Sequence, residues 1–79
     1  MPRFFFHVRD DLDVPDLEGA ELDDLDAARH CARRYARALM CETLVGDGRI
    51  TLNHRIDIED DAHAVVASVP FGESVTIER

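Results

Sequence analysis

The longest regular pattern in this chain of 79 residues is one amphipathic stretch, over residues 24–44. Its apolar residues recur at intervals of three and four, which is typical of a helix with one apolar stripe. Asp23 or Asp24 can cap its start, and Gly46 or Gly48 can end it. A single helix covers only one face of a sheet, so this pattern limits the fold of the rest. The expected stripe is Leu25, Ala28, Ala32, Tyr35, Ala36, Leu39 and Thr43.

Strand patterns flank this helix on both sides. Before it, the aromatic residues 3–9 predict a strand, and an Asp-rich and Pro-containing loop separates them from a second short strand near residues 18–22. After it, alternating residues 52–59 and 64–71 predict two strands joined by a turn at 60–63. The tail GESVTIER could add one more short strand, whose placement the sequence leaves open.

This order of elements predicts an α+β fold, ββαββ, in which residues 1–79 form a single domain. We expect a four-stranded, mainly antiparallel sheet with the helix packed on one face. The strand residues expected to face the helix are Phe4, Phe6, Val8, Ile56, Ile58, Val65, Ala67, Val69 and Phe71. Those predicted to form one mostly buried cluster are Phe4, Phe6, Tyr35, Leu39, Ile56, Ile58, Val69 and Phe71.

The sheet face away from the helix then carries Phe5, His7 and Val66, which need another cover. We predict that these three residues form an interface with a second copy of the chain, because closed two-fold dimers are the commonest oligomers. The alternative for Phe5 is that it lies partly exposed, as isolated apolar residues often do. His7 is expected to be a histidine at the edge of the core rather than a metal ligand.

The charge balance indicates the kind of partner. The chain carries 17 acidic residues against 9 basic ones, a formal net charge of -8, which disfavours nucleic acid as a partner. Arg29, Arg33 and Arg37 recur every four residues along the outer side of the helix, with Arg34 beside them. This patch is a candidate docking surface for an acidic protein segment. The alternative is a solvated face whose arginines pair with neighbouring acids such as Asp26 and Glu42.

Four motifs occur in a recognisable order: MPRFFFHVRD, DLEGAEL, DLDAAR and VPF. Together they resemble a family of short bacterial proteins, classed as a domain of unknown function, that open with MPR, an aromatic run and HV. The resemblance covers nearly the whole chain and implies no activity. The segment DDLDVPDLEG stands where the family usually has a shorter, more glycine-rich turn, which bears on the geometry of the first hairpin.

The function that these features favour is a small non-catalytic homodimeric interaction or regulatory module. The alternative is a tautomerase-like enzyme, in which removal of Met1 would leave the amine of Pro2 as a general base and Arg3, Arg9 or Arg33 would bind a carboxylate. We predict no catalytic residues, no metal and no cofactor. The possible ligands His7, His30, Cys31, Cys41, His54 and His63 lack the close pairing that zinc sites use.

The chain is expected to be cytoplasmic. No apolar run approaches the roughly 18 residues of a membrane span, and the N-terminus lacks the pattern of a signal peptide. Cys31 and Cys41 do not form a CxxC motif, and we expect both to be free thiols in a reducing compartment. We expect no membrane partner.

Overall fold

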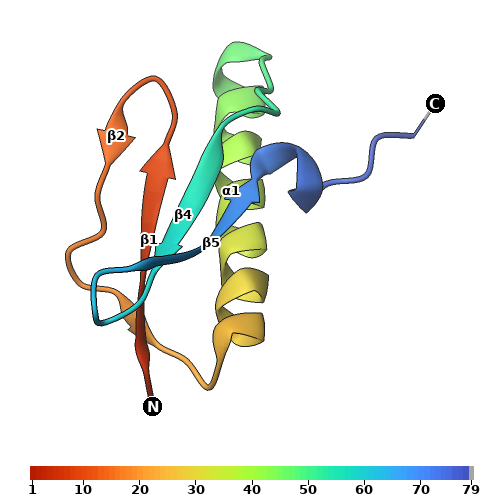
Figure 1. Cartoon of the computed structure of the whole chain (residues 1–79). Coiled ribbons are helices and arrows are strands. Elements are labelled where there is room, and N and C mark those ends of the chain that lie inside the picture. The colour runs from red at the N-terminus through yellow and green to blue at the C-terminus, as the bar shows by residue number, and fades with distance from the viewer. Residues whose placement is uncertain (79) are drawn as a thin grey trace.

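The computed structural model describes residues 1–78, in which one long helix packs against one face of an antiparallel sheet (Figure 1). This confirms the α+β class and the ββαββ order. The elements are β1 (Arg3–Arg9), β2 (Asp13–Val14), β3 (Ala20–Glu21), α1 (Leu25–Asp47), β4 (Arg55–Glu59), β5 (Val65–Pro70) and the 3-10 turn η1 (Phe71–Ser74).

The sheet has the order β2-β1-β4-β5, and β3 also pairs with β1. β2 pairs with the end of β1, where Val8 lies opposite Val14, and β3 pairs with its start, where Phe4 lies opposite Ala20. β3 is the expected second short strand, and β2 is an additional short strand within the segment that was expected to be a loop. β5 forms the other edge of the sheet.

α1 begins and ends at two of the expected caps. The carboxylate of Asp24 accepts a hydrogen bond from the Ala27 N–H at 2.8 Å, which satisfies a free donor of the first turn. Gly48 ends the helix in the left-handed region, with φ of 67°, and its N–H donates to the Leu44 carbonyl. The helix therefore extends to Asp47, beyond the expected end at Leu44.

The helix approaches the sheet through small side chains. Ala28, Ala32 and Ala36 are all 0 % exposed. Because alanine has only a methyl group, the helix backbone lies close to the strands, and the larger side chains of the sheet fill the space between the layers. Six residues of the predicted cluster are buried as expected: Phe4, Phe6, Ile56, Ile58, Val69 and Phe71.

Tyr35 was expected in this core, and that prediction is wrong because its side chain is 40 % exposed. The buried line of α1 follows Ala28, Ala32 and Ala36 and continues to Met40, which is 4 % exposed. Tyr35 lies about 100° from Ala36 around the helix, at the margin of the contact with the sheet. Leu39 is half-buried and packs against the edge of the core.

The start of β5 also differs from the expected alternation. Ile58 pairs with Ala67, whereas the next residue, Glu59, pairs with Val65, so the strand contains a bulge. The bulge places Val65 opposite Glu59, on the side away from α1, and Val65 is 56 % exposed rather than facing the helix. The tail expected as a possible strand has no strand through residue 78, and residue 79 lies outside the described residues.

Candidate functional site

The sheet face away from α1 carries a polar network in place of an apolar patch. His7 and Asp57 lie opposite each other on β1 and β4 and are buried, 8 % and 7 % exposed. Asp57 accepts hydrogen bonds from Ser68 at 2.7 Å, from Arg55 at 3.0 Å and from Arg9 at 3.2 Å. Burial raises the pKa of Asp57, but these donors outweigh it and hold the pKa below its usual value. The carboxylate is therefore ionised and fully engaged.

Asp16 lies in the loop that joins β2 to β3. Its carboxylate accepts hydrogen bonds from the N–H groups of Phe6, Glu18 and Gly19, each at 3.1 Å. Burial raises the pKa of Asp16, but these backbone donors lower it by more, so its pKa lies below the usual value. The Asp16 side chain thus takes the hydrogen bond from Phe6 that a continuous second strand would have taken.

His7 is held by the same loop. Its Nδ1 accepts a hydrogen bond from the Asp16 N–H at 3.0 Å, so the neutral imidazole carries its proton on Nε2. Nε2 lies 3.4 Å from a carboxylate oxygen of Glu59 but makes no hydrogen bond within the described residues, and the Glu59 carboxylate hydrogen-bonds His63 at 3.0 Å. The bond to His63 lowers the pKa of Glu59. The chain itself therefore covers His7, one of the three residues expected at an interface.

Phe5 is also partly covered by the chain itself. Its ring stacks on His63, with centroids 6.2 Å apart, and a Cβ added at Gly19 would lie 2.9 Å from the Phe5 ring. Gly19 has φ of +69°, so the left-handed turn and the close approach to β1 both require glycine there. Phe5 is half-buried as a result, which leaves Val66 as the most exposed of the three expected interface residues.

Val66 lies on β5, the edge strand with free backbone groups. The Phe71 N–H donates to the His54 carbonyl, on the β4 side. Since successive residues of a strand direct their N–H groups to opposite sides, Ala67 and Val69 face β4, whereas Ser68 and Pro70 face outward. Proline at an outward position costs no hydrogen bond within the sheet. The outer side of β5 therefore offers the N–H and C=O groups of Ser68.

The opposite edge of the sheet is better protected. β2 and β3 have two residues each, and Pro15 lies between them. Short strands and proline are features that hinder pairing with another chain. β5 is longer, and its sequence VVASVP contains no charged residue. β5 also has a bulge at its start and Pro70 at its end, but it offers a longer run than β2 or β3, so of the two edges it is the better suited to accept a further strand.

The arginines of the expected docking patch lie on two sides of α1. Arg37 donates from Nε to the Ser74 carbonyl at 2.9 Å, so this side of the helix faces η1. Arg29 and Arg33, at preceding turns, are half-buried on the same flank. Arg34 is exposed on the other side, where it lines a shallow groove with Tyr35. Within residues 1–78, none of these four arginines makes an ion pair, so the expected pairing with Asp26 and Glu42 is not present.

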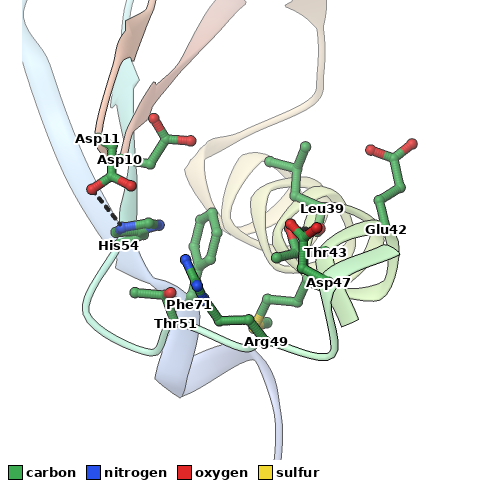
Figure 2. A pocket seen from close by; sticks show the side chains of 11 residues that line it. Asp10, Asp11, Leu39, Glu42, Thr43, Asp47, Arg49, Thr51, His54 and Phe71 are labelled. Carbon is green, nitrogen blue, oxygen red and sulfur yellow. Dashed lines mark hydrogen bonds and ion pairs between the residues drawn. The ribbon is translucent and has the colours of Figure 1, made fainter. Parts of the chain in front are cut away.

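A cavity of about 250 Å³ lies between the end of α1 and the β1–β2 turn (Figure 2). The ring of Phe71 lies inside it, against His54 at 5.8 Å between centroids, and His54 is 3.8 Å from a carboxylate oxygen of Asp11. Because the rim carries several carboxylates near a helix C-terminus, it favours cations over anions. The rim carboxylates belong to Asp10, Asp11, Glu42 and Asp47.

The geometry around Pro2 does not resemble a proline-based active site. Pro2 is exposed, and its carbonyl accepts a hydrogen bond from the Leu22 N–H at 3.0 Å. The nearby Arg3 is bound to the Glu18 carbonyl and to the Glu21 carboxylate, and Arg9 is bound to Asp57. Across residues 1–78, no group of three or more histidine, cysteine or carboxylate side chains is arranged to hold a metal ion.

The fold and these surfaces define a small α+β domain with one helix, a polar helix-free face and an open sheet edge. The chain belongs to the family described as Domain of unknown function (DUF6894), whose model matches residues 3–72. No curated protein and no solved structure matches the chain. Among the described residues, no helix is both long enough and apolar enough to pass through a membrane.

The sequence reasoning missed the network on the helix-free face, although the signal was present. In RIDIE, Asp57 alternates with Ile56 and Ile58, so it had to share a face with His7 once β4 paired with β1. The role of Asp16 had a weaker signal in the sequence. It is an aspartate that shortly precedes Glu18 and Gly19 in a turn. Neither was identified as part of a site.

Proposed function

We propose that this chain is a non-catalytic interaction module that binds an extended segment of a partner by strand addition to β5. The observation that carries the proposal is the free edge of β5, uncharged and with outward-facing backbone groups at Ser68. In strand addition, main-chain hydrogen bonds provide affinity and alternate side chains provide specificity. Val65 and Val66, 56 % and 37 % exposed, add apolar surface at the same edge.

The polar groups of the domain support a binding role rather than a catalytic one. The lowered pKa values of Asp16 and Asp57 keep both carboxylates ionised near neutral pH, where neither can act as a general acid. The Ser68 hydroxyl donates to Asp57, whose lowered pKa and bonds to Arg9 and Arg55 make it a weak base that is poorly suited to activate the hydroxyl. These groups hold the loop and the strands together.

Self-association through Phe5, His7 and Val66 stays a prediction, and β5 is the edge that we propose as the primary interface. The two cysteines, Cys31 and Cys41, are unpaired, which supports a reducing cytosol as the compartment of the protein. An interaction of this kind needs no membrane and no cofactor.

The test is a titration of the ¹⁵N-labelled chain with a short neutral peptide of alternating valine and threonine, long enough to span β5. We expect the largest amide shifts at Ser68 and Val66. A matched peptide with an N-methyl group on every residue lacks main-chain donors on both edges and should not bind. Shifts that gather away from β5, or equal binding of both peptides, would contradict strand addition.

A further inference from the structure

A line of positive charge runs along the helix beside the open edge of the sheet. α1 contacts both β5 and η1, and it follows the same general direction as β5 (Figure 1). The hydrogen bond from Arg37 to the Ser74 carbonyl shows which flank of α1 faces β5 and η1. Arg33 and Arg29 lie on that flank, about one and two turns before Arg37.

These two arginines have no acidic partner within the described chain, residues 1–78. β5 itself is uncharged, and Glu73, which lies next to Arg37 and Ser74, is beyond its end. On the sheet, the carboxylates nearest to β5 belong to Asp57 and Glu59, which lie on the face away from α1 and are engaged by Arg9, Arg55 and His63. On the helix side of this edge, Arg29 and Arg33 therefore remain charges without an ion pair among the described residues, although the net charge of the chain is -8.

The spacing of Arg29 and Arg33 matches that of an added strand. Residues four apart on a helix are separated by about 6 Å along its axis. Alternate residues of a strand, which share one face, are separated by about 6.6 Å. Two carboxylates at alternate positions of a strand bound to β5 would therefore each meet one of these arginines.

We infer that the partner segment at β5 is acidic, with carboxylates at alternate positions that pair with Arg29 and Arg33. This inference rests on the proposed strand addition and names the chemistry of the partner. A second copy of this chain fits the same edge poorly. Antiparallel pairing of two β5 strands about a two-fold axis places both helices on one face, so that the arginine flanks of the two copies face each other and repel.

The experiment compares peptides of alternating valine and glutamate with peptides of alternating valine and lysine, and uses the neutral valine–threonine peptide as reference. Because the chain is acidic overall, non-specific attraction favours the lysine peptide. We expect the opposite order, with the glutamate peptide binding about tenfold more tightly at Ser68, since exposed ion pairs each contribute a few-fold in affinity.

Two single variants with the same change of charge locate the contact. Arg33→Glu should remove or reverse the preference for the glutamate peptide. Arg34→Glu, about 100° around the helix from Arg33, should preserve it. Binding of the neutral peptide and the circular dichroism of each variant show that the fold and the edge are intact.

The outcomes separate this inference from the proposed function. If the neutral peptide binds at Ser68 but the glutamate and lysine peptides bind equally, or lysine binds better, the acidic partner is wrong and strand addition stands. If no peptide shifts Ser68, strand addition itself is wrong. The inference would also be overturned if Arg34→Glu weakened the preference for the glutamate peptide as much as Arg33→Glu does. A dimer, detected by sedimentation, whose dissociation exposes the Ser68 amide would overturn it as well.

Discussion

Asp16 shows how one side chain can replace a piece of a strand. Its carboxylate receives three backbone N–H groups, and its own N–H binds the imidazole of His7. This arrangement connects the interrupted edge of the sheet to the helix-free face. The loop from residue 15 to residue 19 therefore depends on an ionised carboxylate at one position.

We expect Asp16→Asn to lower the free energy of unfolding by about 1–3 kcal/mol at pH 7, because the amide replaces one accepting oxygen with a donor. Since the pKa of Asp16 is lowered from 3.8, its ionised form stabilises the native state above that pH. This contribution is lost as the pH falls through the lowered value, so the difference between the two proteins should shrink below about pH 4.

Urea unfolding followed by circular dichroism at pH 7 and at pH 3 measures this difference. Asp61→Asn is the control, because Asp61 is exposed and its side chain makes no hydrogen bond within residues 1–78. An equal loss in both variants, or a loss independent of pH, would contradict the role given to Asp16.

At the scale of elements, the close contact between α1 and the sheet depends on alanine. Ala32→Leu should destabilise the domain by about 1–3 kcal/mol, because Ala32 is 0 % exposed and the added methylenes have no space between the layers. Thermal unfolding measures the effect. Ala38→Leu is the matched control on the exposed side of the same helix, and it should be nearly neutral. Similar melting temperatures for both variants would show that the helix does not lie close to the sheet.

The sequence predicted the elements whose signals are local. The Asp24 cap, the line of alanines and the aromatic strand β1 each follow from residues near one another in the chain. The arrangement of β2 and β3 along β1 depends on contacts of Asp16 with residues about ten positions earlier. Such contacts depend on the tertiary fold, so periodicity alone could not reveal them.

The bulge in β5 changes which side chains of this strand face the helix. Val65, Ala67 and Val69 share a parity, and simple alternation directs all three to the helix. One additional residue in the strand moves Val65 to the other side. For the same reason, the sequence identified Val65 and Val66 as strand residues but placed Val65 on the wrong face of the sheet.

At the scale of the whole molecule, the domain has one face closed by α1, one face closed by its own polar network, and one open edge. The interface expected over the helix-free face is therefore partly occupied by the chain's own loop and by His63. The edge at β5 and the arginine flank beside it are the surfaces that we propose for a partner.

We expect the outer side of β5 to be free in the isolated chain and to be covered by a strand of the partner in the complex. Amide hydrogen exchange within β5 measures this directly. In the free chain we predict slow exchange at Ala67 and Val69, which face β4, and fast exchange at Ser68. A bound peptide strand should make Ser68 slow as well. Exchange at Ser68 as slow as at its two neighbours in the free monomer would contradict the account.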